Sequence, residues 1–455
     1  MSKKNLVAIF FGLLIGTASP AQTANGADAI ATLAARITEL ERQAQRLREQ
    51  AEQALAAAQS ARDALLLIQQ QTALAALPTA AADAADAIPA AVPAAAPTGA
   101  NGNAFNPAIS VVLNGTYAHH SLPPERYQRA GFPLVGEGGP LSQGLSLGES
   151  EIALSANVDD KFYGQVTLAV GSADGVDEIG IEESFIDALG LPGGISLRAG
   201  RFFSNIGYLN SHHTHTDSFI DRPLVSQAFL GNQYFDDGVQ LRWVAPTDLF
   251  IEVGGEVLRG QRFPGGGAGN GGVGSKTAFV HLGGDIGIEQ SWLAGVSLLH
   301  TDAKLTDDGF SGNADLYIAD ATWKWAPRGN FKDGGLTLRG EAFLESRDGS
   351  FFDTTVATPQ VWNAERWGAY LQGVYRLNRR WETGYRYDYL GAADAGPLAS
   401  SFDPERHTLM LTWLNSEFSL LRLQLSHERP HPDLEDHAIA LQYQVNLGAH
   451  GAHKF

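Results

Sequence analysis

From Phe105 onward, apolar and polar residues alternate in short runs separated by turn-forming residues. In AIALQYQVNL, residues 438–447, every second side chain from Ile439 to Leu447 is apolar or aromatic, and those between are small or carry an amide. In SLLRLQLSHE, residues 419–428, leucines alternate with Arg, Gln and Ser. A period of two predicts β-strands with two unlike faces. Because the polar face is rich in charge and amide groups, we expect the apolar face to meet lipid and the polar face to meet water.

The connections between these runs are alternately short and long. Counting them gives about 16 strands of roughly ten residues or more, and short turns at one end with long loops at the other are typical of outer-membrane barrels. The sequence therefore predicts an all-β fold, a transmembrane antiparallel β-barrel of about 16 strands over residues 104–455. Short links are expected at 158–161, 191–194, 245–248, 287–290, 326–335, 377–380 and 414–417, and the largest loops at 120–145, 205–235, 260–275 and 348–362.

The tryptophans give independent support for this barrel. Indole rings collect at the membrane–water interface, so an aromatic girdle is expected where they gather. Only Trp362 and Trp367 lie near a long loop. The others, Trp243, Trp292, Trp323, Trp325, Trp381 and Trp413, lie beside a short link.

A different pattern precedes the barrel. Between Ile30 and Ile68 the apolar positions recur in alternating steps of three and four, which predicts an α-helical coiled coil over residues 22–77. RITELE, with Arg36, Ile37, Leu40 and Glu41, resembles the short trimerisation signature of parallel three-stranded coiled coils. The alternative is a solvated amphipathic helix that packs on its own barrel. Residues 78–103 read as an Ala/Pro linker.

Composition narrows the classes of partner. The formal net charge of −18 gives no basic surface for nucleic acid. The chain has no cysteine, so any metal must be held by histidines and carboxylates. Residues 1–21 predict a Sec signal peptide, because Lys3 and Lys4 precede a short apolar run that ends before Ser19-Pro20-Ala21.

Two resemblances extend these predictions. A trimerising coiled coil before a barrel of about 16 strands resembles the trimeric porins that carry an N-terminal coiled-coil extension, and a C-terminal aromatic, Phe455, resembles the signal read by the barrel assembly machinery. Segments 146–170, 195–203, 236–254 and 448–455 resemble a group labelled zinc-regulated TonB-dependent outer-membrane receptors. Such receptors have 22-stranded, plugged barrels. The heptads and linker leave no room for a plug here, so the porin architecture is favoured.

These features predict a homotrimer in the outer membrane of a Gram-negative bacterium, with the coiled coil in the periplasm. The expected function is a channel for small hydrophilic solutes, with a preference for divalent cations such as zinc as a further hypothesis; no cofactor is required. The alternatives are a TonB-dependent uptake protein for metal or metallophore, and a structural tether. No nucleophile elbow, phosphate-binding loop or zinc-protease helix is present, so an enzyme is not expected; a phospholipase-type barrel is the enzymatic alternative.

Alternation also predicts which charges face the pore. Basic and acidic side chains on opposite walls would screen solutes by charge; on the fourth strand either Glu182 or Glu183 should face inward. The predicted pore-lining residues are Arg198, Arg242, Arg339, Arg376, Arg386, Arg422, Glu151, Glu252, Glu256, Glu341, Glu345 and Glu382.

Histidines are concentrated in GYLNSHHTHTDSF, residues 207–219. By resemblance to trimeric porins, loop 205–235 would fold into the lumen and narrow it. Imidazoles with carboxylates suit Zn²⁺, as a permeant or as a loop ligand; the alternative is solvated loops in which histidine is incidental. The candidate metal ligands are His212, His213, His215 and Asp217, together with His119 and His120 near the first loop and His427, His431 and His437 near the last.

Overall fold

The computed structural model describes residues 107–173, 176–266, 271–352 and 359–448. The predicted signal peptide, coiled coil with Arg36, Ile37, Leu40 and Glu41, linker and C-terminal Phe455 lie outside the described residues. They stay predictions.

The described chain is made almost entirely of strands. The helical pieces are short: α2 (Leu224–Leu230) and the 3-10 turns η1 (Pro124–Arg126), η2 (Pro192–Gly194), η3 (Leu209–Ser211), η4 (Thr214–Thr216), η6 (Pro327–Gly329), η7 (Phe331–Asp333) and η8 (Gly396–Leu398). The strands are β1 (Ala108–His120), β2 (Gly144–Leu147), β3 (Ser150–Asn157), β4 (Phe162–Ala173), β5 (Val176–Ala188), β6 (Ile195–Phe203), β7 (Phe235–Val244), β8 (Phe250–Leu258), β9 (Ser275–Ile286), β10 (Gln290–Lys304), β11 (Phe310–Trp325), β12 (Gly335–Phe351), β13 (Gln360–Asn378), β14 (Trp381–Gly391), β15 (Glu405–Ser416), β16 (Ser419–His431) and β17 (Leu434–Gly448).

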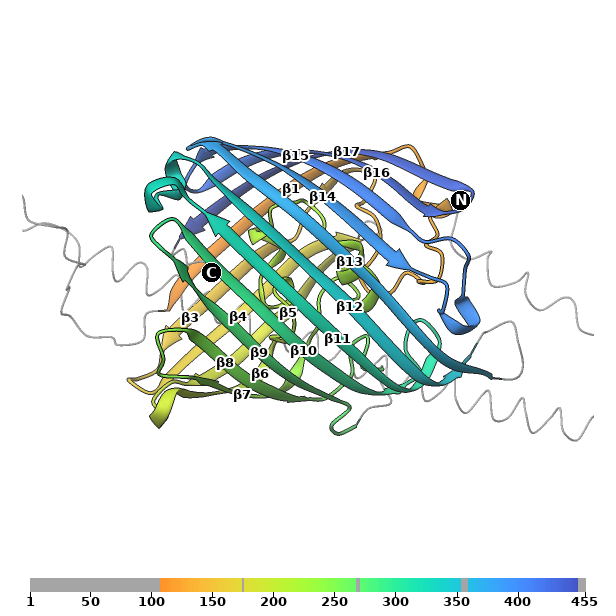
Figure 1. Ribbon diagram of the computed structural model, residues 1–455, viewed down its shortest axis with the longest axis horizontal. Coiled ribbons are helices and arrows are strands. Elements are labelled where there is room, and N and C mark those ends of the chain that lie inside the picture. Colours follow the sequence, from red (N-terminus) through yellow and green to blue (C-terminus); the bar gives the residue numbers. More distant parts are fainter. Residues whose placement is uncertain (1–106, 174–175, 267–270, 353–358, 449–455) are drawn as a thin grey trace, which may run out of the picture. The chain divides into compact units, whose positions relative to one another are not determined.

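The strands form one closed antiparallel sheet. Each strand pairs with its neighbours in sequence, and β1 pairs with β17 from Ser110↔Gly448 to His120↔Ala438, which closes the ring (Figure 1). β2 and β3 both pair with β1, one after the other, so they count as one interrupted strand of the wall. The predicted antiparallel barrel of 16 strands is therefore confirmed.

The outer face of the barrel is apolar. On β13, Leu371 is 62% exposed while the next residue, Gln372, is 4% exposed and faces inward. β16 repeats this with Leu425 outside and Gln424 inside. A contiguous apolar exterior of this kind is the surface that a transmembrane barrel presents to lipid. None of the helices in the described parts of the chain is long and apolar enough to span a membrane.

The two rims of the barrel differ in their connections. We call the end with the short links the turn rim and the opposite end the loop rim. At the turn rim, Trp292 lies directly opposite Trp323 in the register, and the rings of Trp381 and Trp413 are 6.5 Å apart. These pairs occupy the level of the expected girdle. At the loop rim, residues 432–433 alone connect β16 to β17.

Two loops fold into the barrel instead of standing above it. These are the first loop, residues 121–143, and the inner loop, residues 204–234, which Figure 1 shows inside the ring of strands. Phe132 of the first loop packs edge-on against Phe229 of the inner loop at 5.4 Å. Arg129 donates to Gln227 Oε1 at 2.6 Å across the same junction. The two loops therefore pack as one body.

The inner wall beneath these loops departs from the predicted polar lining. Leu299, Leu316, Ile318 and Phe343 face inward from β10 to β12 and join the hydrophobic core formed with the inner loop. The prediction that inward-facing side chains meet water is wrong here. The inner loop shields this part of the wall from solvent, so apolar side chains are stabilised by packing against it.

Candidate functional site

The inner loop leaves the wall through a neck closed by one amide side chain. Asn210 donates to the carbonyl oxygens of Ser204, at 2.7 Å, and Tyr234, at 2.8 Å, and its own oxygen accepts from the Tyr234 N–H at 2.7 Å. These bonds join the two ends of the loop where β6 ends and β7 begins. The segment between them is therefore closed into a loop at its base.

The loop then crosses to β12. Glu341 accepts from the backbone N–H groups of Tyr208, at 3.2 Å, and Leu209, at 3.0 Å, and from Tyr370 Oη at 2.8 Å. Gly207, with φ +63°, permits this approach, since a Cβ there would lie 2.5 Å from Glu341 Oε2. Glu341, predicted to line the pore, is an anchor of the loop.

A second anchor lies on β14 and β15. Asp221 of the loop receives Arg386 Nη2 at 2.9 Å and Arg406 Nη1 at 2.8 Å. Burial opposes the charged carboxylate, yet Arg406 and Arg386 outweigh it and lower the pKa of Asp221 to about 2. Asp388 completes the anchor by accepting from Leu224 N at 3.0 Å and from Arg386 Nε at 2.8 Å.

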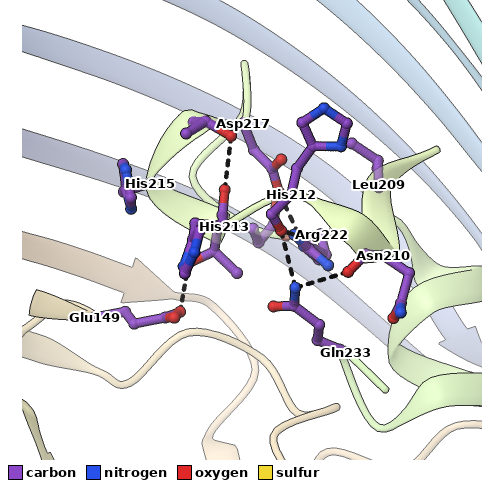
Figure 2. A network of polar contacts seen from close by, with 12 residues as sticks. Glu149, Leu209, Asn210, His212, His213, His215, Asp217, Arg222 and Gln233 are labelled. Atoms are coloured by element: carbon purple, nitrogen blue, oxygen red, sulfur yellow. Dashed lines mark hydrogen bonds and ion pairs between the residues drawn. The ribbon is translucent and has the colours of Figure 1, made fainter. Parts of the chain in front are cut away.

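The tip of the loop meets a group of carboxylates on β3, on β5 and in the link between β2 and β3. His213 Nδ1 is 3.0 Å from Glu151 Oε2 and its Nε2 is 3.0 Å from Glu183 Oε2, while His215 Nδ1 is 2.7 Å from Glu151 Oε1. Thr214 Oγ1 donates to Glu149. Figure 2 shows His213 and His215 on the side of the loop that faces Glu149, with His212 on the other side. We call Glu149, Glu151, Glu182, Glu183, His213 and His215 the tip cluster.

A β-bulge explains how β5 supplies two adjacent carboxylates. The register passes from Glu183↔Thr167 directly to Ile181↔Leu168, so Glu182 is the extra residue. Both Glu182 and Glu183 are consequently turned inward, 9% and 5% exposed. The sequence predicted one or the other. The bulge turns in both, and Glu182 Oε2 lies 3.7 Å from His213 Nδ1.

The tip cluster has the donor set of a divalent metal site. Ligand atoms of Glu151, His213 and His215 all lie within 4.8 Å of one another, as do those of Glu149, Glu151 and Glu182. Imidazole and carboxylate together suit Zn²⁺ and similar ions. Two buried carboxylate oxygens of the cluster, Glu149 Oε1 and Glu182 Oε2, make no hydrogen bond of normal geometry within the described structure.

Docking of the loop tip is expected to depend on pH. Burial disfavours the imidazolium, but hydrogen bonds to Glu151, Glu182 and Glu183 raise the pKa of His213 well above its usual value. Only the imidazolium can donate from both ring nitrogens. The stabilisation is thus fully present below the unfolded pKa of about 6.5 and is lost as pH rises through the higher folded pKa. Single-channel noise should increase at alkaline pH in the native protein.

The matched variant for this pH prediction is His213→Gln. It keeps an amide donor and removes the titration, so its noise should be the same across the pH range. Equal pH dependence in the variant and the native protein would contradict the assignment to His213.

A chamber of about 1310 Å³ extends from the turn rim to the underside of the inner loop. His212, His215, Thr216 and Asp217 form part of its ceiling, while Gly329 and Glu417 belong to the turns at its other end. Its walls carry seven basic side chains, Lys324, Lys332, Arg339, Arg376, Arg379, Arg380 and Arg422, and five acidic ones, Asp217, Asp285, Glu289, Glu382 and Glu417.

The predicted pore-lining residues all belong to inward positions but have different surroundings. Arg339, Arg376, Arg422 and Glu382 line the chamber, and Arg376 pairs with Glu382. Glu256 accepts from Asn205 N at 2.9 Å and so holds the neck of the loop. Glu341 anchors the loop, as described above. The others lie in ion pairs on the wall or loop: Arg198 with Asp187, Arg242 with Glu252, Arg386 with Asp221, Glu345 with Arg366, and Glu151 with the tip histidines.

The predicted metal-ligating histidines do not form one site but lie in several parts of the barrel. His212 stacks on Tyr208 and its Nδ1 is 2.7 Å from the Tyr208 oxygen, so it faces away from the tip cluster. Asp217 accepts from Arg222 Nε at 3.0 Å.

Around the loop rim, adjacent histidines face opposite ways. His120 faces inward with Asp436 at 2.7 Å, whereas its neighbour His119 belongs to the outward set of β1. His427 and His437 face outward beside Glu435, and His431 ends β16. One pore-mouth surface does not contain all of these histidines.

Sequence reasoning missed Glu149, Lys324 and Arg406. Lys324 follows the alternation of β11 and could have been found from it. Glu149 lies between β2 and β3, where the alternation breaks. Arg406 is the second residue of β15, and the boundary of a strand is difficult to predict from sequence.

No family model matches the chain. A relative from Aquifex aeolicus (strain VF5), described as an uncharacterized protein, is 27% identical over 389 residues, which cover 77% of this chain and 80% of the relative.

Similar solved structures are porins and channels. OprB of Pseudomonas putida has 10% identity and a TM-score of 0.49, covering 75% of this chain and 94% of its own. The anion-selective porin of Comamonas acidovorans has 10% identity and a TM-score of 0.49, covering 75% and 99%. The outer-membrane channel DcaP of Acinetobacter baumannii has 11% identity and a TM-score of 0.48, covering 75% and 96%.

Proposed function

We propose that this chain is a non-enzymatic outer-membrane channel that admits small hydrophilic solutes and assembles as a homotrimer. The observation that carries the channel is the charged chamber inside a closed barrel with an apolar exterior. Charged and polar linings sort permeants by charge and size. The inner loop forms the narrow part of the path, because it is anchored at Glu341 on one wall and at Arg386 and Arg406 on another.

We further propose that divalent cations such as Zn²⁺ bind at the tip cluster and modulate this path. The support is the convergence of carboxylates and two imidazoles at the loop tip. The chamber below has more basic than acidic groups, whereas the tip cluster is acidic. The ion preference of the channel therefore depends on whether the acidic tip cluster or the basic chamber contributes more to the electrostatic potential along the path.

Planar-bilayer recording tests the channel and its ion preference separately. The purified full chain should give discrete current steps, and the reversal potential under a KCl gradient should show cation preference. Absence of any conductance would reject the channel. Anion selectivity would reject the cation preference and leave the channel intact.

Zinc block tests the tip cluster. Micromolar to millimolar Zn²⁺ should reduce the single-channel current of the native protein, and His213→Gln with His215→Gln should remove that reduction. The matched control is His300→Gln, which changes a loop-rim imidazole whose Nδ1 is 2.7 Å from Asp315 Oδ1. Unchanged zinc block in the tip variant would reject the metal assignment.

A further inference from the structure

Four aromatic and imidazole side chains form a row across the outer face of the barrel. The register places Tyr387 opposite His407, His407 opposite His427, and His427 opposite His437. The ring centroids are 4.8, 6.5 and 4.7 Å apart along the row. Cross-strand neighbours in direct register have Cβ atoms about 5 Å apart, so their side chains can share a ligand.

The row lies at the boundary of the apolar belt. One step toward the membrane interior, the register joins Tyr385, Leu409, Leu425 and Ile439, all exposed apolar or aromatic side chains. One step toward the loop rim, it joins Glu405 to Arg429. Interfaces of this kind ordinarily carry Trp and Tyr. Here histidines take that level on β15, β16 and β17.

We propose that His427, His437 and Glu435 bind a divalent transition-metal ion on the outer face of the barrel, at the lipid–water boundary. Glu435 Oε1 lies 3.5 Å from His427 Nδ1 and 3.5 Å from His437 Nε2. One ligand atom from each residue lies within 4.8 Å of the other two. His427 Nδ1 is buried and makes no hydrogen bond of normal geometry in the described structure, although Glu435 Oε1 lies 3.5 Å away.

The local charge favours a cation over a lipid phosphate. Glu435 is 57% exposed on its side chain and adds negative charge, while the nearby Arg429 is 3.4 Å from Glu405. Two imidazoles and one carboxylate leave further coordination positions open to water or to oxygen donors of the headgroup layer. The ion would link β16 to β17, the pair that is connected by a two-residue turn. This site faces away from the chamber and is independent of the proposed channel function.

Counting bound zinc tests the proposal. The full chain without an affinity tag, in detergent micelles, is dialysed against Zn²⁺ at pH 7.5, and bound zinc per chain is measured for the native protein and for His427→Gln with His437→Gln. We expect the variant to lose one equivalent of zinc. Because the ion binds only the folded barrel, zinc should also raise the unfolding temperature of the native protein more than that of the variant.

Two controls separate this site from the tip cluster. His213→Gln with His215→Gln should retain the outer equivalent, and His300→Gln should retain all of them. Substituting Cu²⁺ should give nitrogen hyperfine structure from two imidazoles in the tip variant, and this signal should be lost when His427→Gln and His437→Gln are added to the tip variant. The proposal is wrong if the outer variant binds as much zinc as the native protein, or if the tip variant binds none. Conductance of the outer variant should equal that of the native channel, so failure of one proposal leaves the other standing.

Discussion

Asp221→Ala should release the inner loop from the wall and give a larger, noisier single-channel current. The carboxylate of Asp221 is held by both Arg386 and Arg406, and these guanidinium groups are 1% and 3% exposed. Removing one partner of a buried ion pair leaves an uncompensated charge and costs about 3–5 kcal/mol. Current amplitude and open-channel noise in planar bilayers, with protease sensitivity of residues 204–234, give the measurement.

The control for this substitution is Asp433→Ala, since Asp433 is an exposed residue of the two-residue turn between β16 and β17 at the loop rim. It should leave current and proteolysis unchanged. Asp221 has a pKa of about 2, so its contribution is present above the unfolded pKa of about 3.9 and declines only as pH falls toward 2. Noise in Asp221→Ala equal to that of the native channel would show that the loop does not depend on this anchor.

Leu371→Arg should strongly impair folding into a bilayer. Leu371 points outward near the middle of β13, at the level expected to meet hydrocarbon. An arginine on the lipid face costs about 2–4 kcal/mol at the bilayer midplane. Folding of the urea-denatured chain into phospholipid vesicles, followed by tryptophan fluorescence, measures this free energy.

Val361→Arg is the matched control because it changes the same face of the same strand. Val361 is 78% exposed and lies near the loop-rim end of β13. There the cost of arginine falls to about 0–1 kcal/mol. Equal costs at both positions would contradict a membrane-spanning β13 and, with it, the channel.

The barrel could be predicted because its signals are local. Alternation in β16 and β17 and the short links at 377–380 and 414–417 each occupy a few adjacent residues, and the structure places strands and turns there. The two-residue period of a strand could also have predicted which histidines near the loop rim face outward. His427 follows Leu425 by two residues, so it had to share the outward face.

The packing of the first loop and the inner loop inside the barrel could not be predicted in the same way. The contact between Phe132 and Phe229 joins residues far apart in sequence, and nothing local distinguishes a loop that folds inward from one that stands in solvent. The bulge at Glu182 is similarly hidden, since one unpaired residue leaves little trace in a pattern of period two. The bulge brings both Glu182 and Glu183 into the tip cluster. The sequence therefore predicted the histidines of this cluster, Glu151 and one residue of the pair Glu182 and Glu183 as inward-facing groups, whereas Glu149 was missed.

The strands of the wall differ greatly in length. β6 and β8 have 9 residues each, whereas β12 and β13 have 17 and 19. A tilted strand needs about 9–11 residues to cross the hydrocarbon layer. Deletions should therefore be tolerated unequally around the circumference: β13 can lose residues from its loop-rim end and still reach across the bilayer, while β6 and β8 have no residues to spare. Variation in strand length among natural relatives should accordingly be concentrated at long strands such as β12 and β13.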